Sequence, residues 1–143
     1  MLLSRGTIHR TTKPRIGGQK DALMATILVI DDQESIRRLL RHTLEGVGYE
    51  VLEAANGRLG LVLFRERAVD LVVTDIAMPE MNGLQLMLEL TRSFINVKVI
   101  AISGCPEGEH GLNKATLLGA RQTFQKPFKM EQLLRAVRYE LAH

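Results

Sequence analysis

The sequence predicts an α/β fold in which short strands of a parallel sheet alternate with amphipathic helices. From residue 24 onward, short apolar runs alternate with segments whose apolar residues recur at helical spacing. The 143 residues suit one domain. A composition of 45% hydrophobic and 24% charged residues is typical of a globular protein, and no apolar run reaches the ~18 residues that would span a bilayer.

The first strand and helix open this domain. Residues 26–30 form a continuous apolar run with β-branched members, which is typical of a central strand buried on both faces. Asp31 and Asp32 follow at its carboxyl end. Apolar residues then recur at helical spacing over residues 36–44, and Gly46 ends this predicted helix.

The rest of the chain repeats this alternation. Further strands are expected over residues 49–54, 69–74, 97–102 and 123–125. Helices are expected over residues 59–64, 84–90, 112–118 and 133–141. Residues 104–111 contain three glycines and one proline, which predicts a flexible loop.

Polar side chains follow four of the five predicted strands. Sites in open parallel sheets form beyond the carboxyl ends of the strands, so we expect these side chains to converge at one edge. A lone Asp or Ser after a strand is more often a helix cap or turn residue, but convergence of four such ends has no simple structural explanation. The residues are Asp31 and Asp32 after the first strand, Asp75 after the third, Ser103 after the fourth and Lys126 after the fifth.

Three neighbouring carboxylates call for a cation. Two like charges ~4 Å apart repel by roughly 1 kcal/mol in water and by ~4 kcal/mol at an effective dielectric constant near 20. Oxygen ligands favour a hard ion such as Mg²⁺, whereas a single cysteine and four scattered histidines argue against zinc. With a cation present, a carboxylate can attack an activated phosphoryl group and form an aspartyl phosphate. Lys126 would add positive charge and Ser103 a hydroxyl donor.

Four segments carry a family resemblance. They are residues 30–34 (IDDQE), 75–83 (DIAMPEMNG), 103–104 (SG) and 126–128 (KPF). Through them the chain resembles the receiver domains of two-component response regulators over residues 24–143. The resemblance implies a doubly wound, flavodoxin-like fold with a five-stranded parallel sheet in the order 2-1-3-4-5 and helices on both faces.

The resemblance also assigns roles to the acidic residues. It makes Asp75 the phosphoacceptor and a ligand of Mg²⁺. Asp32 is then a direct ligand of the ion, Asp31 acts through a bound water, and the backbone carbonyl of Ala77 is another ligand.

At the other strand ends, the resemblance implies that Ser103 bonds a phosphoryl oxygen and that Lys126 pairs with the phosphate. The peptide between Lys126 and Pro127 is expected to be cis. The chain departs from the family at Thr123, where an aromatic ring that takes part in switching is common. Phe124 is adjacent, but it belongs to the opposite face of the strand and is interpreted as a core residue.

The expected function is that of a phosphoacceptor module in a two-component phosphorelay. Such a module is not a conventional enzyme, although it catalyses its own phosphorylation and dephosphorylation. The resemblance implies a sensor histidine kinase or phosphotransfer protein as donor. Only 17 residues follow Lys126, so we expect a stand-alone receiver that acts through contacts with a downstream protein, as a monomer or weak dimer.

Two alternatives remain open from the sequence. A receiver-like module could bind partners without phosphorylation, although nothing in packing requires Asp32, Asp75, Ser103 and Lys126 together. A phosphohydrolase of the haloacid dehalogenase type also uses an Asp nucleophile on a doubly wound sheet. That class has Asp-x-Asp after the first strand and a cap insertion, and neither is found in this sequence.

Residues 1–23 differ from the rest in charge. They hold five basic residues and one acidic residue, so the remaining chain is nearly neutral despite the net charge of +3. Their glycines, Pro14 and lack of apolar periodicity predict a disordered basic N-terminal extension. We expect neither a nucleic-acid nor a membrane partner. A single cysteine, Cys105, gives no sign of an oxidising compartment, so a cytoplasmic location is expected.

Overall fold

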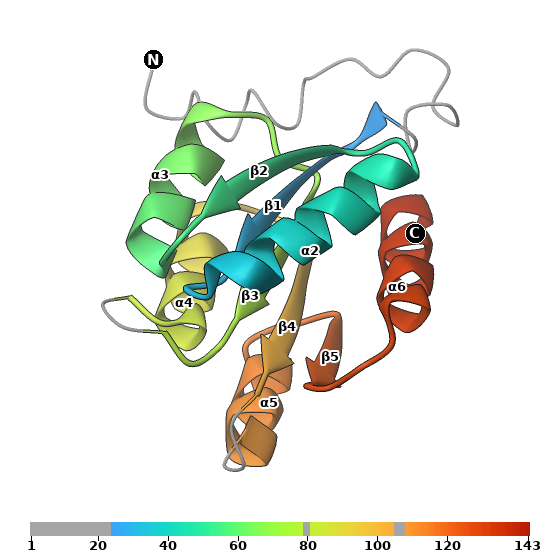
Figure 1. The fold of residues 1–143 in the computed structure, drawn as a ribbon. Coiled ribbons are helices and arrows are strands. Elements are labelled where there is room, and N and C mark those ends of the chain that lie inside the picture. Colours follow the sequence, from blue (N-terminus) through green and yellow to red (C-terminus); the bar gives the residue numbers. More distant parts are fainter. Residues whose placement is uncertain (1–23, 79–80, 105–107) are drawn as a thin grey trace.

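A computed structural model describes residues 24–78, 81–104 and 108–143 (Figure 1). The predicted N-terminal extension, residues 1–23, lies outside the described residues. The strands are β1 (Thr26–Ile30), β2 (Glu50–Ala54), β3 (Leu71–Asp75), β4 (Val99–Ser103) and β5 (Gln122–Gln125). The helices are α2 (Glu34–Gly46), α3 (Gly57–Glu66), α4 (Gly83–Ser93), α5 (Gly108–Leu117) and α6 (Met130–Ala142).

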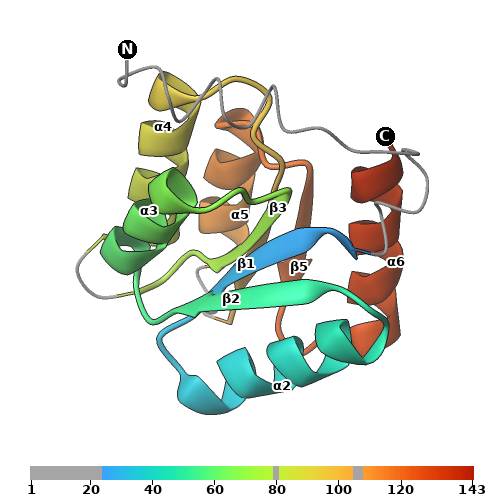
Figure 2. The same ribbon diagram turned by 90° about the horizontal axis from the view of Figure 1, so that it is seen from above.

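The sheet has the topology that the resemblance implied. All neighbouring strands pair in parallel, in the order β2-β1-β3-β4-β5. Figure 2 shows α2 and α6 on one face of the sheet and α3, α4 and α5 on the other. This order makes β1 and β3 neighbours at the centre, so the residues that follow them meet at the same edge.

The core consists of two clusters, one on each face of the sheet. Leu28 and Ile30 of β1 pack in the cluster shared with α3, α4 and α5. Ile27 and Val29 point the other way, into the cluster shared with α2 and α6. Burial of one such side chain contributes about 1.5–3 kcal/mol. The predicted burial of this strand on both faces is therefore confirmed.

The start of α5 differs from the prediction. Residues 105–107 lie outside the described residues, but the helix begins at Gly108, within the segment predicted to be a flexible loop. A glycine inside a helix costs only about 1 kcal/mol relative to alanine, which tertiary packing can offset. Ala115 is buried and Leu112 packs against the core, so contacts with the sheet favour the helix.

Two asparagine caps set the start of α3 and α4. Asn56 Oδ1 accepts a hydrogen bond from the Leu59 amide at 2.9 Å. Asn82 Oδ1 accepts from the Gln85 amide at 2.9 Å, and Gln85 Oε1 accepts from the Asn82 amide at the same distance, which completes a capping box. Both helices begin one or two residues before their apolar pattern does, because their first residues, Gly57 and Gly83, carry no apolar side chain.

Within the described part of the chain, none of the helices is both long enough and apolar enough to span a membrane.

Candidate functional site

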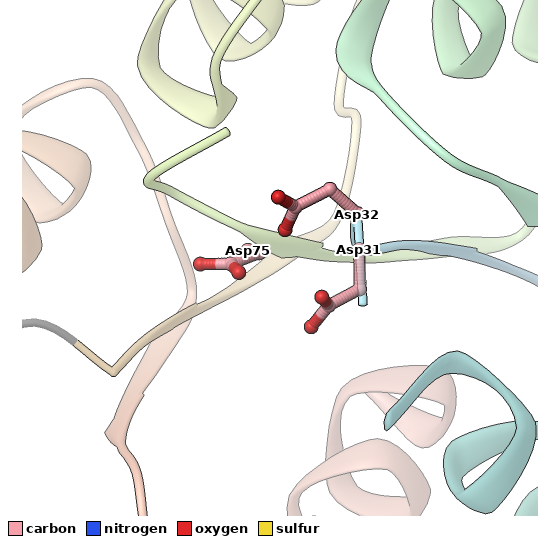
Figure 3. A group of neighbouring side chains, drawn as sticks. All are labelled: Asp31, Asp32 and Asp75. Atoms are coloured by element: carbon pink, nitrogen blue, oxygen red, sulfur yellow. The ribbon is translucent and has the colours of Figure 1, made fainter. Parts of the chain in front are cut away.

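Three carboxylates gather where β1 and β3 end. One oxygen each from Asp31, Asp32 and Asp75 lies within 4.8 Å of the others, and Figure 3 shows the three side chains side by side. Asp31 and Asp75 are 1% and 6% exposed, whereas Asp32 is open to solvent. The predicted convergence of these side chains is therefore found in the structure.

The two buried carboxylates are held in the same way. Asp31 Oδ1 accepts from the amide of Gln33 at 2.9 Å, and Asp75 Oδ1 accepts from the amide of Ala77 at 3.2 Å. Each is a bond from an Asp side chain to the backbone two residues further on, which is characteristic of an Asx turn. These bonds leave Oδ2 of each residue available to Lys126, which reaches it from the loop after β5.

Lys126 bridges the buried carboxylates. Its Nζ lies 3.1 Å from Asp31 Oδ2 and 3.4 Å from Asp75 Oδ2. Two buried carboxylates thus share one ammonium group, and Asp32 adds a third negative charge. Burial raises the pKa of Asp75, and the neighbouring charge of Asp31 raises it further, while Lys126 partly opposes both effects. The site therefore favours an additional positive charge.

The loop after Asp75 packs tightly against the strand end. The Gly83 amide donates to the Ile76 carbonyl at 2.9 Å. A Cβ atom at Gly83 would lie 2.4 Å from the backbone oxygen of Asp75. One added at Gly57 would lie 2.2 Å from the Met81 carbonyl oxygen. The absence of side chains at these two positions lets the N-termini of α3 and α4 close on the loop that begins with Asp75.

Ser103 and Lys126 are joined through the backbone. Ser103 ends β4, is buried, and its carbonyl accepts from the Lys126 amide at 2.7 Å. Gly104 follows, and a Cβ atom there would lie 3.0 Å from Lys126 Cδ, so this glycine makes room for the lysine chain. The peptide between Lys126 and Pro127 is cis, as the resemblance implied.

A cavity of about 750 Å³ opens over this edge of the sheet. Polar residues, among them Asp32, Asp75 and Lys126, line it together with Ala77 and Gly104. Ser103 is not among the lining residues. A further wall is apolar and comes from α2 and from the segment leading into α6; its residues are Ile36, Leu39, Pro127, Phe128 and Met130.

The contacts of Gln33 at the site were not predicted from the sequence. Its amide holds Asp31, and its side-chain Oε1 lies 3.4 Å from Lys126 Nζ. The turn was foreseeable, because an Asp directly after a strand commonly bonds the amide two residues later. The contact with Lys126, which is 93 residues away in the sequence, depends on the fold.

The interpretation of the last strand is confirmed. Phe124 packs with the cluster under α2 and α6, and its ring centroid lies 5.4 Å from that of Phe128. Thr123 is half-buried and pairs with Ala101, which belongs to the cluster under α3, α4 and α5. Phe124 is thus a core residue on the face opposite to the one that Thr123 occupies.

In a doubly wound sheet, ligands bind beyond the carboxyl ends of the strands, which is where this chain carries its acidic cluster. Residues 27–138 match the model of the family described as the response regulator receiver domain. The chain belongs to this family. It is therefore a phosphoacceptor module of two-component signalling, and the haloacid dehalogenase alternative does not agree with this membership.

Individual relatives support the assignment. The chain is 33% identical to the chemotaxis protein CheY of Thermotoga maritima over 112 residues, which cover 78% of this chain and 92% of that protein. It is 37% identical to the probable transcriptional regulator ycf27 of Porphyra purpurea, again over 78% of this chain. The match covers only 45% of ycf27, so the chain spans about half the length of some curated relatives.

A solved structure resembles this one closely. The response regulator TrrA of Thermotoga maritima, in complex with Mg(2+)-BeF, superposes with a TM-score of 0.74 and is 32% identical. The superposition covers 82% of this chain and 99% of TrrA.

Receiver domains bind Mg²⁺, and the carboxylates of this chain suit that ion. Oxygen atoms around an octahedral Mg²⁺ lie about 3 to 4 Å apart, because each is ~2.1 Å from the metal. The three carboxylate oxygens lie within 4.8 Å of one another, which is close to this spacing. Mg²⁺ commonly keeps several of its waters, and such a water can connect the ion to a carboxylate that does not contact it directly.

Proposed function

We propose that Asp75 is the phosphoacceptor of this chain. The observation that carries the proposal is its position: it is buried at the end of β3, within reach of Asp31, Asp32 and Lys126. The metal ligands we propose are Asp31, Asp32, Asp75 and the carbonyl of Ala77; the phosphoryl-binding groups are Ser103 and Lys126.

The chemistry follows from the charges of these residues. Mg²⁺, when bound, neutralises charge on the transferring phosphoryl oxygens. A carboxylate oxygen of Asp75 attacks the phosphorus atom, and the bond from phosphorus to the donor's leaving group breaks. The leaving group departs with the electron pair of that bond, and Asp75 keeps the phosphoryl group as an acyl phosphate. Lys126 Nζ, now shared between Asp31 and Asp75, turns to a phosphoryl oxygen.

Removal of the phosphoryl group uses the same residues. A water molecule attacks the phosphorus atom in line with the acyl oxygen, and Asp75 leaves as a carboxylate. Lys126 stabilises the negative charge that develops on the phosphoryl oxygens in both directions. We propose that the domain thereby catalyses both its own phosphorylation and its own dephosphorylation.

The partners follow from membership in the family. Receiver domains interact with histidine kinases and phosphotransfer proteins, and we propose that one of these donates the phosphoryl group to Asp75. Output passes to a downstream protein that the chain does not identify. Residues 24–143 form the receiver domain in this proposal. The basic extension over 1–23, a cytoplasmic location and a monomer or weak dimer stay predictions.

A labelling experiment tests the proposal. The wild-type chain and the variant Asp75→Asn are incubated with acetyl phosphate and Mg²⁺, and the phosphorylated fraction is measured on phosphate-affinity gels. We expect labelling of the wild type and none of the variant, because an amide is not a nucleophile toward phosphorus. Glu66→Gln, which makes the same chemical change at an exposed position of α3, should label normally. Full labelling of Asp75→Asn would exclude Asp75 as the acceptor, and an unlabelled wild type would favour the non-phosphorylated alternative.

A further inference from the structure

We propose that Arg37 is a positioning residue for the metal-binding pair Asp31 and Asp32. It acts on the backbone of Asp31, and it belongs neither to the proposed metal ligands nor to the phosphoryl-binding groups. The inference rests on the proposed function, because it assumes that Asp31 and Asp32 hold Mg²⁺.

Arg37 spans the segment that carries the acidic pair. Its Nη1 donates to the carbonyl oxygen of Asp31 at 2.8 Å. Its own amide donates to the carbonyl oxygen of Gln33 at 3.0 Å. The backbone bond is the ordinary helical bond that opens α2, whereas the side chain of Arg37 reaches back across the turn to the end of β1.

Glu53 fixes the direction of the Arg37 side chain. Arg37 Nε lies 3.1 Å from Glu53 Oε1, and the two side chains are only 16% and 22% exposed. Glu53 lies on β2, in register with Val29 of β1, so it is held by the sheet. The planar guanidinium presents several N–H groups at fixed angles, which lets one side chain bond Asp31 and Glu53 at once. A lysine offers a single nitrogen and cannot reproduce this fork.

Glu53 is itself held by a second arginine. Its Oε2 lies 2.7 Å from Arg41 Nη1, and Arg41 also contacts Glu45 at 2.9 Å. The bond from Arg41 is the largest cause of the lowered pKa of Glu53, so this carboxylate stays ionised and keeps its attraction for Arg37.

With Arg37 in place, every polar group of Asp31 makes a hydrogen bond or an ion pair. Its amide donates to the Ala54 carbonyl at 3.2 Å, and its carboxylate contacts the Gln33 amide and Lys126. The carbonyl that Arg37 binds is the remaining group, and it forms the peptide that leads into Asp32. Restraining this peptide restrains the direction from which the exposed carboxylate of Asp32 approaches the ion.

The direction in which the Mg²⁺ affinity changes when Arg37 is removed distinguishes positioning from electrostatic repulsion. Arg37 is positive and lies beside an acidic cluster, so its charge alone opposes the binding of a cation. Its removal would then increase the affinity for Mg²⁺. If Arg37 instead holds the ligands in place, its removal decreases that affinity, as substitution of residues that orient metal ligands commonly does.

The test is calorimetric titration of Mg²⁺ into the unphosphorylated full chain. We expect Arg37→Gln to bind Mg²⁺ about tenfold more weakly than the wild type, within the range typical of residues that orient ligands. Arg38→Gln is the matched control, since it removes the same charge from the neighbouring position of α2, where Arg38 is exposed and pairs with Glu34. Affinity for Mg²⁺ in Arg37→Gln equal to or above that of the wild type would overturn the inference.

A second measurement needs no metal. Amide hydrogen exchange should become faster at Gln33, whose amide donates to Asp31, in Arg37→Gln and stay unchanged at Ala77, which belongs to the other turn. Unchanged exchange at Gln33 would overturn the inference. If Arg37→Gln does not fold, Arg37→Lys is measured in its place, with the same expectations. A wild type that binds no Mg²⁺ would overturn the proposed metal site and this inference together, whereas equal binding by wild type and variant overturns this inference alone.

Discussion

The two edges of the sheet both bury charged groups, but they balance them differently. At the carboxyl edge, Asp31 and Asp75 share the ammonium group of Lys126, and Asp32 adds another negative charge. At the amino edge, Glu140 of α6 is 5% exposed, and its carboxylate accepts from Gln122 Nε2 at 2.9 Å and lies 3.4 Å from Arg121 Nη1.

This difference distinguishes a charge that stabilises the fold from the charges of the proposed metal site. Glu140 is compensated within the protein, and Lys98 also donates to its backbone carbonyl, so the cluster ties α6 to the segments that lead into β4 and β5. The carboxyl edge keeps excess negative charge, which destabilises the metal-free protein and makes it receptive to a cation. An uncompensated buried charge is thus the physical feature that marks the site.

The largest expected loss of stability comes from a substitution in the loop at the carboxyl edge. Gly83→Ala should destabilise the domain by about 3 kcal/mol, because the new Cβ would meet the backbone oxygen of Asp75, which cannot move aside as a side chain can. Gly46→Ala is the control: a Cβ there meets nothing within 4 Å, so the same change at the end of α2 should be neutral or slightly stabilising. Urea unfolding measures both, and equal stability of the two variants would contradict the packing described for the loop.

Glu140→Ala tests the amino edge. We expect a loss of about 2 kcal/mol in the free energy of unfolding, because Gln122 and Arg121 lose a buried acceptor. Glu131→Ala, an exposed position on the same helix, should change stability far less. Phosphorylation of Glu140→Ala by acetyl phosphate should remain once the variant is folded. Abolished labelling in a folded variant would show that the two edges are not independent.

A smaller change in the free energy of unfolding, with a defined pH dependence, is expected for Asp75→Asn. Burial and the charge of Asp31 raise the pKa of Asp75, so the folded state binds its proton more tightly than the unfolded state does. The stability that this carboxyl contributes is fully present below its unfolded pKa and is lost as the pH rises through its folded pKa. Without Mg²⁺, the variant should therefore be more stable than the wild type at neutral pH, by on the order of 1 kcal/mol from relieved repulsion.

That advantage should shrink on acidification, because the wild-type carboxyl becomes neutral as well. Thermal unfolding in the presence of a chelator, from neutral pH down to the range where carboxyls protonate, follows the difference between the two proteins. A constant difference at all pH values, or a less stable variant at neutral pH, would contradict the excess of negative charge at this edge.

The sequence could predict what depends on local pattern. The alternation of apolar runs and helical periodicity located all ten described elements, and the polar residues at the strand ends predicted the group of carboxylates and Lys126 that the structure brings together. The Asx turns at Asp31 and Asp75 are also local and could have been predicted. The order of the strands came from the family resemblance and not from the periodicity.

Contacts between distant segments could not be predicted in this way. The strand ends predicted that Lys126 and Asp31 converge, but the direct contact of Lys126 Nζ with Asp31 Oδ2, across 95 residues, depends on the assembled sheet. Glu140 lies in the helix expected over residues 133–141, but its contacts with Gln122 and Lys98 come from other parts of the chain and could not be predicted from that pattern. The position of Arg37 between Asp31 and Glu53 likewise requires β1, β2 and α2 to be assembled.

The most direct test of the central claim is to map the phosphorylated residue in the wild-type chain. After incubation with acetyl phosphate and Mg²⁺, borohydride reduction converts an aspartyl phosphate into a stable product that tandem mass spectrometry can assign to one residue. The excess negative charge at the carboxyl edge predicts a product at Asp75 that disappears when a chelator removes Mg²⁺. A product at a different residue, or labelling of Asp75 that is unaffected by the chelator, would contradict it.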